Sequence, residues 1–311
     1  MENIQPFDFN FELGRIPRES QPTDFPASVL LGQGAPVQPI WKPEDAMNLP
    51  ITMQGTIPAC GGFAAQYRLV HQLFKATGQY LPLGPRSSYA EDKSIDGFGK
   101  NVPGTTIQAI AKSVTAMGIA LDTLFSNDIT LDPSVYADYS LMSQAAIADA
   151  LTRATEESYF FTGKSPSLDT LKQLIEQYDG VILEVEVGPE WYTAPNGQTS
   201  WAAADILPNG KLRPPSKNVS GHFIYCPAHD ENILFPNEWS SKWGNDGWGA
   251  LGQDYVPFIT NGLAFKKVPV SVQQTLKSQP QITPTQISIA QRILIDIEQV
   301  LGLMQKEVAG L

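Results

Sequence analysis

Three residues that lie far apart in the sequence carry the side chains that catalysis by a thiol nucleophile needs. Cys60 stands just before a predicted helix, His222 begins a predicted strand, and Asn237 follows later in the chain. A thiol attacks as its thiolate, and both a helix N-terminus and a nearby imidazole lower the thiol pKa. A further polar group must orient the imidazole. The sequence therefore offers a candidate nucleophile, a candidate general acid/base and a candidate orienting residue.

The segments around these residues resemble three motifs of the papain-like cysteine peptidase family. Gln54 precedes Cys60 at the spacing of the glutamine in the family's first motif. Gly221 and His222 open an apolar strand, as in the histidine motif. The asparagine motif is the most specific, and residues 237–248 keep its order of Asn, Trp and Gly without a gap. The resemblance covers roughly residues 40–270 and is sharp in these three segments.

This resemblance implies a role for each matched residue. Cys60 would be the thiolate nucleophile, and His222 would be its general acid/base partner. Asn237 would hold the imidazole through a side-chain hydrogen bond, and Trp239 would shield that bond from water. Gln54 would form the oxyanion hole together with the backbone N–H of Cys60.

A weaker match lies in GKNVPGTTIQAI, which resembles the family's glycine-containing segment before its next long helix. There Gly104 would offer backbone pairing to an extended substrate. Neither a metal nor a cofactor is expected, because two cysteines and three histidines leave little room for a zinc cluster. Cys226, His71 and His229 are interpreted as residues without a catalytic role.

Several positions depart from the family pattern. Ile57 stands where members usually have a second, disulfide-bonded cysteine, and Gly61 replaces the usual aromatic residue after the nucleophile. The missing ring predicts looser packing at the start of the helix. Glu238 and Ser240 replace the usual Ser and Gly of the asparagine motif. Glu238 is expected either to raise the pKa of His222 or to face solvent.

The elements that must position these residues are helices first and strands later, which is typical of an α+β protein with two lobes. The expected fold is papain-like, with a helical N-terminal lobe, an antiparallel β C-terminal lobe and the active site between them. The predicted helices are 63–78, 105–118, 143–158 and 167–178, and the predicted strands are 180–188, 222–226, 231–236, 254–260 and 262–268.

The chain divides into three predicted parts. Residues 1–40 form an extended arm, interpreted either as a pro-segment or as a partner-binding arm. Residues 41–270 form the catalytic domain, with the lobes at about 41–165 and 166–270. Residues 271–311 hold a linker and an amphipathic helix at 284–308, which packs on its own domain or on a partner chain. Its apolar stripe comprises Ile289, Ile293, Ile297, Val300, Leu301 and Met304.

Composition and charge exclude several classes of partner. The 311 residues carry a net charge of −11, which disfavours binding to nucleic acid or to an anionic membrane. The N-terminus does not resemble a signal peptide, and no apolar run is long enough for a transmembrane helix. Two cysteines do not form a disulfide framework, although one bridge is arithmetically allowed. The expected location is the cytoplasm or a virus- or phage-type particle.

The predicted function is that of a cysteine peptidase, which cleaves peptide or protein substrates through an acyl-enzyme. One alternative is a structural or assembly protein of a virion or particle, which keeps the papain-like fold with or without activity. It would bind an assembly partner through residues 1–40 and 284–308. A further alternative is amidase or acyl-transfer chemistry with the same three residues.

Overall fold

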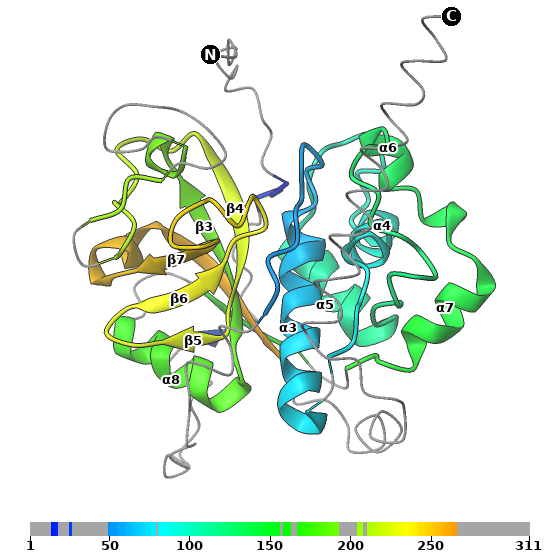
Figure 1. Ribbon diagram of the computed structural model, residues 1–311, viewed down its shortest axis with the longest axis horizontal. Helices are drawn as coiled ribbons and strands as arrows, with labels where there is room; N and C mark the ends of the chain where they lie inside the picture. Colours follow the sequence, from blue (N-terminus) through cyan, green and yellow to red (C-terminus); the bar gives the residue numbers. More distant parts are fainter. Residues whose placement is uncertain are drawn as a thin grey trace, which may run out of the picture.

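The computed structural model describes residues 14–17, 25–26, 49–78, 80–155, 158–162, 167–192, 204–207 and 210–265. The predicted C-terminal helix at 284–308 and most of the predicted arm at 1–40 lie outside the described residues. Helices gather on one side of the molecule and two sheets on the other (Figure 1). The architecture is mixed α+β, as the sequence predicts.

The helical side is built around a central buried helix, α3, which the other helices surround. Its residues are buried from Cys60 to Leu73, and Gly78 ends it in the left-handed conformation with a φ of 71°. α3 packs against α4 and α5 on one side and against β4 of the sheet on the other. The helices of this side are α3 (Cys60–Thr77), α4 (Pro85–Ile95), α5 (Ile107–Ala116), α6 (Pro133–Tyr136) and α7 (Gln144–Leu151).

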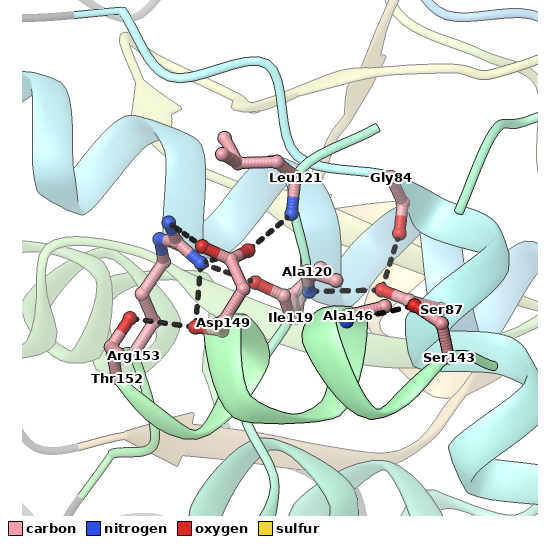
Figure 2. A network of polar contacts seen from close by, with 10 residues as sticks. All are labelled: Gly84, Ser87, Ile119, Ala120, Leu121, Ser143, Ala146, Asp149, Thr152 and Arg153. Carbon is pink, nitrogen blue, oxygen red and sulfur yellow. Dashed lines mark hydrogen bonds and ion pairs between the residues drawn. The ribbon is translucent and has the colours of Figure 1, made fainter. Parts of the chain in front are cut away.

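A network of polar contacts ties α7 to the segment that follows α5 (Figure 2). The carboxylate of Asp149 accepts hydrogen bonds from Arg153 Nη1 and Nη2 at 2.7 and 2.9 Å and from the backbone N–H of Leu121 at 2.8 Å. Ser87 accepts from the backbone N–H of Ala120 at 3.0 Å. These contacts join α4, α7 and the segment between them.

The strand side contains a five-stranded and a three-stranded sheet. The larger sheet has the order β1-β2-β8-β3-β4, antiparallel except for the parallel pair β1–β2, and the smaller has the antiparallel order β5-β6-β7. α8 (Leu168–Tyr178) packs on the strands. The strands are β1 (Phe25–Pro26), β2 (Ser158–Thr162), β3 (Val181–Val187), β4 (Ser220–Cys226), β5 (Ala228–His229), β6 (Ile233–Pro236), β7 (Trp248–Leu251) and β8 (Ile259–Phe265).

Two large hydrophobic cores hold these layers together. One lies at the boundary between the helical side and the sheet, where Val70 of α3 joins Phe223 of β4 and Leu263 of β8. The other lies among the strands and α8 and contains the buried indoles of Trp191 and Trp243. Because α3 and β4 both contribute to the first core, the positions of Cys60 and His222 are fixed by the same packing.

The structure corrects some of the predicted elements. The segment predicted as a strand at 254–260 is mainly a 3₁₀ helix, Gln253–Phe258, whose Pro257 has no N–H to give to a sheet. The helix predicted at 143–158 ends at Leu151, and residues 158–162 form β2 instead. The sequence reading missed α4 and β7. None of the described helices is both long and apolar enough to span a membrane.

Candidate functional site

Cys60 is the first residue of α3 and is completely buried. The residue before it, Ala59, has no side chain that can cap the helix, so none of the first backbone N–H groups is satisfied by a capping side chain. These free N–H groups and the helix dipole favour negative charge at this end. The local sequence therefore places a thiol where a thiolate or an oxyanion is stabilised.

His222 lies on β4, directly opposite Val185 of β3. The backbone N–H of Phe223, one residue after the histidine, is directed at the Cys60 thiol closely enough to lower its pKa. His222 Nε2 lies 3.2 Å from Asn237 Oδ1, and both side chains are completely buried. Since an amide oxygen only accepts, this contact places the imidazole proton on Nε2. Nδ1 then carries the lone pair, and it has no hydrogen-bond partner among the described residues.

Asn237 is held by the loop that follows β6. Its backbone N–H donates to Gly247 O at 2.8 Å, which closes the loop of residues 237–247 on itself. Gly247 has a φ of 87°, a conformation that glycine adopts without strain. A Cβ added there would also lie 2.5 Å from Ile51. Gly247 thus allows the loop to close at the asparagine, which holds the backbone of Asn237 in place.

Two indoles enclose the histidine and its hydrogen bond. The ring centroid of Trp239 lies 5.2 Å from that of His222. The Tyr192 ring stacks on the Trp239 indole, with their centroids 4.9 Å apart. The edge of Trp191 meets the imidazole at 5.7 Å. Trp239 therefore lies against the histidine, and Trp191 is a second aromatic neighbour that the sequence motifs do not indicate.

Glu238 lies inside the site, so the expectation that it faces solvent is wrong. Its side chain is 1% exposed, and Oε1 lies 3.3 Å from His222 Nε2. Burial raises the pKa of this carboxyl well above its usual range. The pKa of His222 is lowered to about 4, mainly by burial, and the contact with Asn237 opposes this shift. Burial therefore outweighs any rise in the histidine pKa that a charge on Glu238 would cause.

Burial also changes the pKa of Cys60. It raises the pKa of the Cys60 thiol, and a charge on Glu238 raises it further. The N–H groups of Phe223 and Gly61 and the charge of Arg15 act in the opposite direction. With the cysteine and histidine both buried, the neutral thiol and neutral imidazole are favoured over the ion pair. Cys60 and Cys226 are both free thiols.

Gln54 is buried close to these residues, and its backbone N–H donates to Glu238 O at 2.7 Å. This bond ties the loop before α3 to the asparagine segment. The side-chain amide donates to the carbonyl of Ile57. An amide group has two N–H bonds, so one donor remains for an oxyanion.

Among the described residues, the backbone of Gly104 contacts side chains and not an extended chain. Its N–H donates to the Tyr89 hydroxyl at 3.1 Å, and its carbonyl accepts from Lys93 Nζ at 2.8 Å. The next residue, Thr105, makes the pairing instead: it donates to Gly14 O at 2.8 Å and accepts from Ile16 N at 2.6 Å. Residues 14–17 of the arm therefore lie beside the helical half of the site.

The start of α3 is well packed, which corrects the expectation about Gly61. A Cβ added at Gly61 would lie 2.6 Å from Thr105 Cγ2 and 2.9 Å from Ile110 Cδ1. The volume of the usual aromatic ring is thus taken by neighbouring side chains rather than left empty. Within the part of the chain that the structure describes, no cluster of His, Cys, Asp and Glu has the arrangement of a metal site.

Comparisons with known proteins bear on the fold of the chain. No family model matches the chain. Cathepsin J from Mus musculus is 22% identical over 256 residues, which is 80% of this chain and 70% of that protein. The structure of xylellain, a cysteine protease from Xylella fastidiosa, superposes with a TM-score of 0.61 at 17% identity and covers 82% of this chain and 96% of that one.

A second solved structure, the digestive procathepsin L2 proteinase from Tenebrio molitor, superposes with a TM-score of 0.56 at 14% identity, over 83% of this chain and 79% of that one. Xylellain and this proteinase share with the present chain a mixed α+β fold. The resemblance that three short motifs indicate is therefore confirmed at the level of the fold: the chain has the fold of the papain-like cysteine peptidases.

Proposed function

We propose that this protein is a cysteine peptidase in which Cys60, His222 and Asn237 act together. The observation that carries the proposal is the position of the Cys60 thiol. It lies buried at an uncapped helix N-terminus, where the backbone N–H of Phe223, the residue after His222, lowers its pKa, and His222 itself contacts Asn237. The contact with Asn237 would set the tautomer and the orientation of the His222 imidazole before any substrate binds.

The reaction follows from these positions. Nδ1 of His222 takes the thiol proton as sulfur attacks the peptide carbonyl, and the oxyanion is stabilised by the Cys60 N–H and the Gln54 amide. The imidazolium then gives its proton to the leaving amine, which leaves an acyl thioester on Cys60. Water attacks the thioester and gives one proton to His222, which returns it to the departing thiolate sulfur. The acid product and the free thiol are restored.

The test is covalent labelling with a peptidyl epoxide, mapped by mass spectrometry, combined with cleavage of a panel of denatured proteins under reducing conditions. We expect an adduct on Cys60, and a loss of cleavage of at least about 10⁴-fold in Cys60→Ala. Cys226→Ala is the matched control, since it removes the other buried free thiol. Cleavage by Cys60→Ala at the wild-type rate, or an adduct on Cys226 alone, would overturn the proposal.

A further inference from the structure

The arm contributes one side chain to the region between the lobes. Arg15 Nε lies 2.9 Å from Glu184 Oε1, and the side chains are 10% and 1% exposed. Glu184 belongs to β3, on the wall formed with β4 and β8, whereas Arg15 comes from a segment far away in the sequence. Figure 1 draws this arm segment in dark blue between the helices and the sheet.

Both oxygens of the Glu184 carboxylate have a partner, and one of these partners is a cation. Oε2 accepts a hydrogen bond from Asn261 Nδ2 at 2.9 Å, across the β3–β8 pair, and Oε1 faces the guanidinium. Asn261 is itself buried, and its Oδ1 has no hydrogen-bond partner among the described residues. A buried carboxylate with a neighbouring spare acceptor fits a side chain with several N–H donors.

The site is also shaped to take a long side chain. A Cβ added at Gly221 would lie 2.0 Å from Arg15 Cδ and 2.4 Å from its Nε, so only a residue without a side chain leaves room for the arginine stem. Gly221 directly precedes His222, and the charge of Arg15 reaches the Cys60 thiol and lowers its pKa. The acidic site of Glu184, Asn261 and Gly221 therefore adjoins the catalytic residues.

The arm reaches this site along a path that fits closely. A Cβ added at Gly14 would lie 2.0 Å from the carbonyl oxygen of Pro58, two residues before the nucleophile. On the other side, residues 14 and 16 pair with the backbone of Thr105. An extended chain is thus held by its backbone on the helical side while its basic side chain enters the sheet side, as a bound peptide would be held.

We propose that the acidic site binds an arginine or lysine side chain of the substrate near the scissile bond, and that Arg15 of the arm occupies this site in the substrate's place. This proposal rests on the proposed peptidase function. Arginine is preferred over lysine, because its planar guanidinium presents five N–H donors and Arg15 Nε already pairs with the Glu184 carboxylate. Glu184 is a specificity-determining residue and takes no part in the chemical steps.

The first experiment measures specificity in the full-length chain with Arg15→Ala, where the competing side chain is absent. Quenched fluorescent peptides carry arginine or its neutral isostere citrulline at each position in turn. We expect arginine to raise kcat/KM about 10- to 100-fold at one position. In Glu184→Gln, which keeps the size of the side chain, this ratio falls close to one. Glu176→Gln, which removes an equal charge from α8, keeps the ratio.

A second experiment does not need catalysis and so separates this proposal from the peptidase assignment. A labelled peptide of residues 10–20 is titrated into the full-length Cys60→Ala, Arg15→Ala protein, and its citrulline analogue is titrated in parallel. We expect about tenfold weaker binding of the analogue, and no difference when Glu184→Gln is added. Equal binding of the two peptides would overturn the acidic site. Arginine-selective binding without any cleavage of peptides would instead overturn the peptidase function.

Discussion

Two clusters of buried polar groups in this molecule differ in how completely their donors and acceptors are hydrogen-bonded. The Asp149 carboxylate accepts hydrogen bonds from Nη1 and Nη2 of Arg153 and from the backbone N–H of Leu121, so each of its oxygens has a donor (Figure 2). Around His222, several groups are left without partners among the described residues: Nδ1 of the histidine, Nδ2 of Asn237 and Oε1 of Gln54. Buried polar groups are normally hydrogen-bonded, because an unmet donor or acceptor costs free energy.

The difference separates a structural role from a chemical one. The Asp149 cluster stabilises the packing of α7, and its carboxylate oxygens are both paired, although Arg153 Nε has no partner among the described residues. Trp239 and Trp191 pack against His222, but donors and acceptors of this cluster have no partner among the described residues. Such groups are available to hydrogen-bond with a bound substrate. The two clusters should therefore respond in opposite ways when one residue is removed.

The largest effect is expected from Asn237→Ala. Loss of the Oδ1 contact frees the imidazole to take the wrong tautomer and orientation, and kcat/KM should fall by about 10²–10⁴-fold. Stability should change by less than about 1.5 kcal/mol, because a single neutral hydrogen bond is lost. Peptide cleavage and urea unfolding measure the two quantities. Unchanged cleavage would show that the asparagine does not orient the histidine.

The reverse pattern is expected from Asp149→Ala. It leaves the buried Arg153 cation without its carboxylate, and the free energy of unfolding should fall by about 2–4 kcal/mol. Cleavage per folded molecule should stay within about twofold of wild type. A double variant, Asp149→Ala with Arg153→Met, is the control, and it should recover part of the loss because no charge stays unpaired. Loss of cleavage without loss of stability would contradict the division of roles.

A smaller effect is expected from Glu238→Gln, and it concerns pH. A carboxylate beside Cys60 disfavours the thiolate and raises the thiol pKa, so the uncharged amide should let the thiolate form at lower pH. The pH profile of iodoacetamide labelling at Cys60 should move down by about one unit. Glu176→Gln, far from the thiol on α8, serves as the comparison and should leave the profile in place. A shift to higher pH would reverse the assigned sign.

The sequence predicts the fold class better than the bounds of its elements. Cys60, His222 and Asn237 can be proposed from sequence because each stands in a short segment with its own pattern. The strand predicted at 254–260 is wrong because apolar periodicity contains no information about the hydrogen bonds of Tyr255. There its hydroxyl accepts from Trp191 Nε1 and donates to Glu186 O, each at 2.7 Å, which a helical turn allows.

Other features depend on contacts that no local pattern contains. Whether Glu238 is buried depends on how the whole loop of residues 237–247 closes, and its neighbours in sequence are polar as well as aromatic. The pairing of Arg15 with Glu184 joins an irregular segment to a strand 169 residues later in the numbering. In sequence alone, Glu184 and Glu186 look like an alternating pair of solvated acids, yet Glu184 is buried.

The close approach of Gly14 to Pro58 also bears on how this protein can change over generations. At most positions, a point mutation alters a contact by degrees. At Gly14, every other amino acid brings a Cβ into a carbonyl oxygen 2.0 Å away, so any replacement pushes the arm outward. Substitution at this position therefore acts through the Cβ that all other amino acids share, so even alanine requires the backbone of the arm or of Pro58 to shift.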